Sequence, residues 1–165
     1  MKNKVLLAIV IIGALFVIWY FFPKQTYLIF ASPRSDEVYL HEQVETGDEI
    51  EIAWTHSVEH TPWIERFRVD EKGRLTLIET RFQSYGAGTP ENTNGTLTVE
   101  NGFIVITDLN ETYETYNWIH SHDADYTVTI DHHKEIETTA LPDQTPIEIK
   151  VKRLRFPPIF STKGA

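Results

Sequence analysis

The sequence predicts a mostly β protein, an antiparallel β-sandwich or open barrel preceded by one transmembrane helix. Three observations support this fold class. An 18-residue apolar run from Val5 to Phe22 contains no charged residue. From Thr26 onward, short alternating stretches rich in Val, Ile, Thr and aromatic residues are separated by turn residues, a pattern typical of strands. No segment after the apolar run shows a convincing helical period.

The apolar run is predicted to be an uncleaved membrane anchor. As a helix it would span about 27 Å, close to the hydrocarbon thickness of a bilayer. Lys2 and Lys4 precede it, so we expect a cytoplasmic N-terminus and a single-pass protein of the cell membrane. A signal peptide would have a shorter core and a small-residue cleavage site. The expected organisation is an anchor over residues 1–24, an extracytoplasmic β domain over 25–156 and a flexible tail over 157–165.

The remainder of the chain is expected to form one domain. Each strand with its turn takes about eleven residues, which suits an antiparallel sandwich or barrel. The longest flexible piece is expected at residues 86–95, and loops of this kind often carry function on β scaffolds. The expected strands cover residues 27–31, 37–41, 49–58, 63–69, 75–84, 96–99, 103–107, 126–130 and 147–156.

The composition excludes several classes of function. Lys2 and Lys4 are the only charged residues before Pro23, so the rest of the chain has 13 Lys and Arg residues against 24 Asp and Glu residues. A domain this acidic lacks the basic stripe that follows a nucleic-acid backbone, so no nucleic-acid partner is expected. The chain contains no cysteine, which excludes disulfides, thiolate metal sites and a cysteine nucleophile.

Strand register predicts that polar side chains gather on an apolar face. The first hairpin, aligned on its apolar residues so that Trp54 faces Phe67, places His56 opposite Glu65. Directly opposed side chains have Cβ atoms about 5 Å apart. These two residues are therefore expected to touch.

The second hairpin extends this polar row. When it is aligned so that Phe67 faces Leu77, Glu79 lies opposite Glu65, and Arg81 lies one step further along the same face. Two alignments based only on apolar residues thus predict one cluster of four polar residues across three strands.

Charged groups on an apolar face are costly unless they are paired or bound, and the sequence leaves two main interpretations open. The row is a closed network in which Arg81 bridges Glu65 and Glu79 while His56 caps it. Alternatively, it is an open cleft that uses these groups on a ligand. A metal site is disfavoured because Arg81 is nearby. No metal and no cofactor are assigned.

Histidines and aspartates also gather at residues 120–125 and 131–133, His-Ser-His-Asp-Ala-Asp and Asp-His-His. Histidines beside acids on an acidic surface are more often simply solvated, so no metal ligand is assigned. The chain has no nucleophile elbow, phosphate-binding glycine loop or His-Glu-x-x-His motif. We therefore assign no catalytic residue, and a hydrolase that uses Glu65 or Glu79 remains the less favoured alternative.

Two motifs resemble those of an uncharacterised bacterial family. The chain has Thr-His-Ser-Val-Glu-His-Thr-Pro at residues 55–62 and Glu-Thr-Arg-Phe-Gln-Ser-Tyr-Gly-Ala-Gly at residues 79–88. Both are similar to motifs of the domain-of-unknown-function family numbered eighteen-fifty. The motif positions and the polar row together give the predicted ligand-binding residues His56, Ser57, Glu59, Glu65, Glu79, Arg81, Ser84, Gly86 and Gly88.

The resemblance implies a small exported protein whose gene often lies beside the permease of a tripartite ATP-independent periplasmic (TRAP) transporter of the TAXI type. It implies no activity. The expected function is that of a membrane-anchored accessory protein of such a transporter, with the permease or its solute-binding protein as partner and a polar cleft for a ligand or that partner. A free-standing extracytoplasmic ligand-binding domain is the alternative.

Basic residues cluster near the C-terminus of the otherwise acidic chain. They are Lys150, Lys152, Arg153 and Arg155. They form either the exposed face of a last strand or a contact with anionic lipid head groups, to which each basic residue near the surface contributes about 1 kcal/mol.

Overall fold

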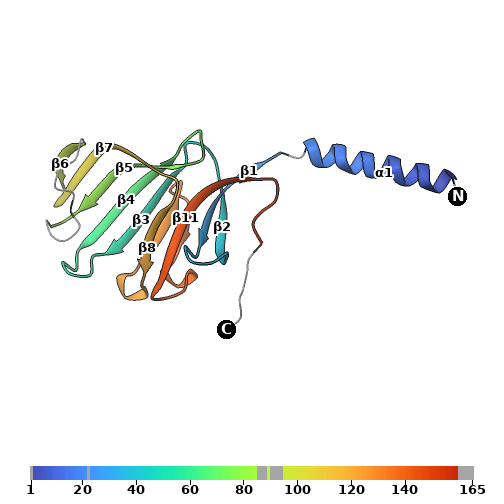
Figure 1. The fold of residues 1–165 in the computed structure, drawn as a ribbon. Helices are drawn as coiled ribbons and strands as arrows, with labels where there is room; N and C mark the ends of the chain where they lie inside the picture. Colours follow the sequence, from blue (N-terminus) through green and yellow to red (C-terminus); the bar gives the residue numbers. More distant parts are fainter. Residues whose placement is uncertain (1, 22, 85–88, 90–94, 160–165) are drawn as a thin grey trace.

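The structure, a computed structural model, describes residues 2–21, 23–84, 89 and 95–159 (Figure 1). These residues form an N-terminal helix, α1 (Lys2–Phe21), and two antiparallel β-sheets. The prediction of a mostly β, antiparallel fold is confirmed. Within the described residues, no helix combines the length and the apolar character that a membrane span requires.

The two sheets differ in size. The smaller sheet has the strand order β2 (Val38–Val44), β1 (Gln25–Ala31), β11 (Thr145–Leu154) and β8 (Tyr116–His120). The larger sheet has the order β10 (Lys134–Ile136), β9 (Thr127–Ile130), β3 (Glu49–Thr55), β4 (Pro62–Val69), β5 (Leu75–Phe82), β7 (Phe103–Tyr113) and β6 (Thr96–Glu100). Short 3-10 turns, η1 (His122–Ala124) and η2 (Thr138–Ala140), follow β8 and β10.

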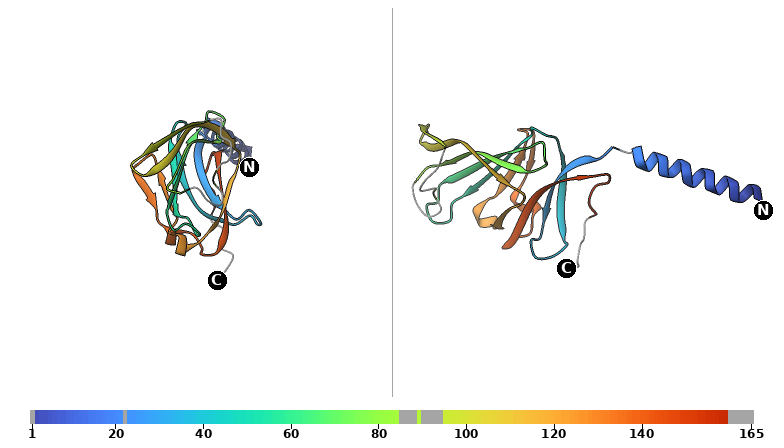
Figure 2. Two further views of the ribbon diagram at one scale, coloured as in Figure 1. Left: turned by 90° about the vertical axis from the view of Figure 1, so that its left-hand side faces the viewer. Right: turned by 45° about the horizontal axis from the view of Figure 1, so that its top comes forward.

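Apolar side chains of the two sheets meet in one core. Phe30 and Ile149 of the smaller sheet and Ile50, Ile52 and Phe67 of the larger sheet are buried in the same cluster. Burying each such side chain contributes about 1.5–3 kcal/mol. The domain is therefore a β-sandwich, and Figure 2 shows its two sheets from the end and from a tilted view.

Two of the strands in the described part of the chain, β8 and β10, were not predicted. In β8, the half-buried Tyr116 and Trp118 alternate with the exposed Asn117 and Ile119. This alternation is typical of a strand with one face on the core. The signal was present in the sequence, but the strand is only five residues long.

The β3–β4 hairpin has a different register from the one predicted. Trp54 pairs with Trp63 rather than with Phe67, so the two strands are offset by four residues. The hairpin closes earlier than expected because the backbone N–H of His56 donates a hydrogen bond of 2.9 Å across a six-residue loop. His56 therefore does not lie opposite Glu65. An offset by an even number of residues leaves every side chain on its predicted face.

Strand β5 contains a bulge at Ile78. Phe67 pairs with Leu77 as predicted, but on the other side of the bulge Glu65 pairs with Thr80 instead of Glu79. One extra residue reverses the faces of all the residues that follow it. The burial pattern of β5 confirms this reversal, because its strict alternation is interrupted there.

The bulge moves Glu79 and Arg81 to the outer face of the sheet, so the predicted cluster of four polar residues is wrong. In their place Thr80 and Phe82 turn inward, with side chains only 2% and 1% exposed. Burying an aromatic ring stabilises the fold, whereas burying charges without good partners destabilises it. This difference in free energy favours the bulged strand.

Helix α1 and the β3–β4 loop lie at opposite ends of the sandwich (Figure 1). Strand β1 begins next to α1, and its Thr26 pairs with Val44, the last residue of β2. The β2–β3 turn is therefore near α1, and β3 runs away from it. The β3–β4 loop and the connection from β8 to β9 lie at the remote end.

Candidate functional site

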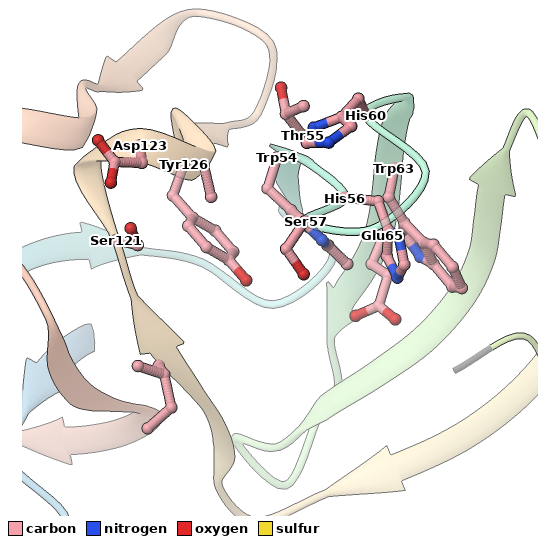
Figure 3. Close-up of a pocket in the computed structure, with 12 residues that line it drawn as sticks. Trp54, Thr55, His56, Ser57, His60, Trp63, Glu65, Ser121, Asp123 and Tyr126 are labelled. Atoms are coloured by element: carbon pink, nitrogen blue, oxygen red, sulfur yellow. The ribbon is translucent and has the colours of Figure 1, made fainter. Parts of the chain in front are cut away.

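A pocket of about 650 Å³ opens between the two sheets, and Figure 3 shows the residues that line it. It lies at the end of the sandwich remote from α1 (Figure 1). One wall comes from β3, β4 and their loop, and the other from the end of β8 and the segment that leads to β9. The volume is in the range of sites for small molecules. The described residues that line it are Trp54, Thr55, His56, Ser57, His60, Trp63, Glu65, Ile119, Ser121, Asp123, Ala124 and Tyr126.

A ladder of aromatic rings runs across one side of this pocket. The ring of Tyr126, just before β9, stacks on Trp54 at 5.5 Å between centroids. Trp54 stacks on Trp63 at 5.7 Å, and Trp63 stacks on Phe82 at 4.8 Å. Each pair joins neighbouring strands and contributes about 0.5–1.5 kcal/mol beyond its buried area. The ladder therefore makes this end of the pocket both apolar and rigid.

Glu65 lies on the inner face of β4, among groups that carry no positive charge. Its partners across the strands are Ile52 and Thr80. The hydroxyl of Tyr116, from the other sheet, donates a hydrogen bond to the Glu65 carboxylate. Burial raises the pKa of Glu65 because it disfavours the charged form. In the described part of the chain, no Lys, Arg or His forms an ion pair with this carboxyl group.

The hydroxyl of Tyr126 is a second polar group in the pocket. Burial, together with the nearby Glu65, raises the pKa of Tyr126 to about 12, so the hydroxyl stays protonated at neutral pH. Figure 3 shows this hydroxyl and the Glu65 carboxyl group directed into the space between the two walls. Glu65 and Tyr126 thus offer a carboxyl group and a neutral hydroxyl to a ligand.

The β3–β4 loop brings His56 and Ser57 to the pocket. The ring of His56 stacks on Trp63 at 5.6 Å between centroids, and its Nδ1 accepts a hydrogen bond of 3.2 Å from the backbone N–H of Glu59. Glu59 in turn accepts a hydrogen bond of 3.0 Å from the Ser84 hydroxyl. Glu59 and Ser84 therefore hold the loop against the end of β5 and do not line the pocket. The remaining predicted loop residues, Gly86 and Gly88, lie outside the described residues.

Glu79 and Arg81 belong to a separate network on the outer face. They form an ion pair with each other, and Glu79 also lies 3.6 Å from Arg66. Arg66 pairs with Glu51 at 3.0 Å. Glu79 and Arg81 therefore belong to an ion-pair network, as one interpretation of the sequence predicted. The other members of this network are Arg66 and Glu51, not Glu65 and His56. The sheet lies between Glu79 and Arg81 on one side and His56 and Glu65 on the other.

His120 and His122 fix the second wall of the pocket. The buried ring of His120 accepts a hydrogen bond of 3.3 Å from the Trp118 indole and donates one of 2.8 Å to the carbonyl of Thr138. His122 Nε2 lies 2.9 Å from the carbonyl of Leu141. Among the described residues, no group of three or more His, Cys, Asp or Glu side chains is arranged to hold a metal ion.

The aromatic residues Trp54, Trp63 and Tyr126 were missed as site residues by sequence reasoning. A signal existed for two of them, because Trp54 and Trp63 occupy inward positions at the ends of strands that flank the first motif. Tyr126 carried no such signal, since it is far from them in the sequence. Its position depends on how β9 pairs with β3.

The fold is a small antiparallel β-sandwich with a pocket between its sheets. The chain belongs to the family "Domain of unknown function (DUF1850)", whose model matches residues 50–136, more than half of the 165 residues. The matched part includes both motifs and every lining residue of the pocket. No curated protein and no solved structure gives a significant match.

Proposed function

We propose that this protein is a membrane-anchored binding domain that presents its pocket to a small ligand on the far side from the anchor. The observation that carries the proposal is the pocket itself, with its aromatic ladder and the carboxyl group of Glu65. Such a carboxyl group reduces the stability of the fold, because burial without a cationic partner costs free energy. Groups that reduce stability are concentrated at functional sites.

The proposal assigns the anchor to the apolar run from Val5 to Phe22, with an N-terminus in the cytoplasm and the β domain outside it. Large apolar side chains of α1 are exposed, such as Ile12 at 65% and Phe16 at 61%. Lys2 and Lys4 at its start favour the cytoplasmic side. A reporter that is active only outside the cytoplasm, fused after Ala165, should be active, and activity of a cytoplasm-only reporter there would contradict this topology.

Contact with anionic lipid head groups remains part of the proposal. Lys152 and Arg153 are exposed near the end of β11, at the side of the sandwich that joins α1. Arg155 donates a hydrogen bond of 2.7 Å to the carbonyl of Trp19 in α1. This places basic side chains where the head groups would lie if α1 spans the bilayer.

For the partner, we propose the permease or the solute-binding protein of a TAXI-type TRAP transporter. The family resemblance supports this choice, and a pocket remote from the anchor would face a solute-binding protein rather than the membrane. A free-standing ligand-binding domain is the second candidate, because the pocket has the volume of a small-molecule site without any partner. A hydrolase that uses Glu65 and Glu79 as a pair is disfavoured, since they lie on opposite faces of one sheet.

Copurification tests the choice between these candidates. The full-length protein, extracted in mild detergent after cross-linking in cells, should bring down the permease or the solute-binding protein. An outer-face variant, Arg68→Ala, should copurify the same partner and serves as a control for expression and folding. If the cross-linked protein carries neither transporter component, the free-standing binding domain is favoured.

A further inference from the structure

The pocket is acidic and has no permanent positive charge in its walls. Glu65 and Asp123 are among its lining residues, and no Lys or Arg is among the described residues that line it. The side-chain cations of β4 and β5 lie on the other face of the sheet. There Arg66 pairs with Glu51 at 3.0 Å, and Arg68 pairs with Glu49 at 2.8 Å.

The sheet therefore leaves the charge of Glu65 without a cation from the described residues. An opposite charge within a few Å would favour ionised Glu65, but the partner that the described residues supply is the neutral hydroxyl of Tyr116. A ligand that carries a positive charge would provide the missing partner. An anionic ligand would meet both Glu65 and Asp123, and it is disfavoured by repulsion.

The aromatic lining suits the same kind of ligand. The rings of Trp54, Trp63 and Tyr126 line one side of the pocket and give it an apolar surface. The apolar part of a ligand also gains from contact with these rings, because it leaves water. The hydroxyl of Tyr126, which has no hydrogen-bond partner in the described part of the chain, can accept a hydrogen bond from an ammonium group that carries an N–H, such as that of phenethylamine.

We propose that the pocket binds an organic ammonium ion. Its charged group lies between the carboxylate of Glu65 and the hydroxyl of Tyr126, and its apolar part lies against the indoles of Trp54 and Trp63. The inference rests on the proposed binding function and adds the chemical class of the ligand.

One consequence is a pH dependence that a neutral ligand would not show. Because burial raises the pKa of Glu65, a cation that binds the carboxylate displaces a proton from part of the molecules. The affinity for a permanently charged cation should therefore rise with pH until Glu65 is ionised in the free protein, and then level off. The part of this rise that Glu65→Gln removes is the part due to Glu65. Other titratable side chains near the site are His56, His60, Glu111, Asp123 and Tyr126.

The test uses the full-length protein in an uncharged detergent without choline head groups. Binding is followed by calorimetry and by tryptophan fluorescence, with choline, its neutral carbon isostere dimethylbutanol, phenethylamine and phenylpropionate as probes. We expect choline to bind about tenfold more tightly than dimethylbutanol, a difference of about 1.4 kcal/mol. Phenethylamine should bind more tightly than phenylpropionate.

The matched variants are Glu65→Gln and Glu79→Gln, which remove one carboxylate from each face of the same sheet. Glu65→Gln should abolish the preference for choline over dimethylbutanol, while its amide oxygen still accepts the Tyr116 hydrogen bond. Glu79→Gln should keep the preference. If Glu65→Gln fails to fold, the preference of the unchanged protein for choline over dimethylbutanol still tests the proposed ligand class.

The outcomes separate the ligand class from the binding function. Equal affinity for choline and dimethylbutanol, tighter binding of phenylpropionate, or no binding of either cation at tens of millimolar would overturn the proposal. Binding of dimethylbutanol or phenylpropionate that Trp54→Leu weakens would overturn only the ammonium class and would support the pocket as a binding site. No response to any of the four probes would count against both.

Discussion

The charged residues on the two faces of strands β3, β4 and β5 differ in their partners. On the outer face Arg66 and Arg68 pair with Glu49 and Glu51 at distances of 2.8 to 3.8 Å. On the inner face Glu65 has a tyrosine hydroxyl as its partner and no cation from the described residues. The same three strands thus carry a network of neutralised charges on one side and an uncompensated carboxyl group on the other.

This difference indicates which charged residues are candidates for a functional role. Ion pairs at a partly exposed surface add little stability and need no ligand to explain them. A carboxyl group turned toward the core, beside a pocket and without a cation, costs stability and has no structural benefit that the contacts reveal. The comparison therefore explains Glu79 and Arg81 by their structural ion pairs, and it supports the binding role that we propose for Glu65.

Phe82→Ala should have the largest effect, because it removes the ring that the bulge at Ile78 turns inward. Phe82 is only 1% exposed. Losing the buried ring alone costs about 3–5 kcal/mol, a large part of the total stability of a small domain. Circular dichroism during urea denaturation should show a protein that is unfolded or nearly so.

The control for this variant is Ile78→Ala, which keeps the bulge and removes only a half-buried side chain. We expect a loss of about 1 kcal/mol, typical of single substitutions. If Phe82→Ala is as mild as Ile78→Ala, the burial of this ring does not explain why the bulged strand is favoured.

Glu79→Gln should have a clear but smaller effect. Its carboxylate is the shared partner of Arg66 and Arg81, and the side chain is 12% exposed. We expect a loss of about 1–3 kcal/mol, between the values for exposed and for fully buried ion pairs. A melting temperature unchanged from that of the original protein would show that the outer network contributes nothing to stability.

Glu65→Gln should change the free energy of unfolding by a different amount, and in the opposite direction, compared with Glu79→Gln. Because the pKa of Glu65 is raised in the folded state, its contribution to stability is fully present below the unfolded pKa and is lost as pH rises through the folded pKa. The free energy of unfolding of the original protein, minus that of Glu65→Gln, should therefore fall as pH rises from about 4. A difference that stays flat, or rises, between acidic and neutral pH would mean that Glu65 is not desolvated.

Arg68→Ala should have the smallest effect. Its side chain is 52% exposed, and it pairs with Glu49 at the surface. We expect a loss of about 0.2–1 kcal/mol that decreases further in high salt. Denaturant titrations at two salt concentrations measure it, and a loss as large as that of Glu79→Gln would contradict the view that the outer pairs differ by burial.

The sequence by itself determined the β class and the inner face of the third and fourth strands. The alternation of Ile50, Ile52 and Trp54, and of Trp63, Glu65 and Phe67, assigns these residues to the inner face whatever the exact register. For that reason an error of four residues in the first hairpin left Glu65 correctly placed. A period of two survives any even offset.

Only the tertiary structure decided which groups meet in the pocket. The bulge at Ile78 depends on the gain from burying Phe82, which strict alternation along one strand does not reveal. The contact from Tyr116 to Glu65 joins residues 51 positions apart in two different sheets. Tyr126 reaches Trp54 because β9 pairs with β3. Such contacts depend on how the sheets pack and on how strands far apart in the sequence pair. Local patterns of polarity therefore do not predict them.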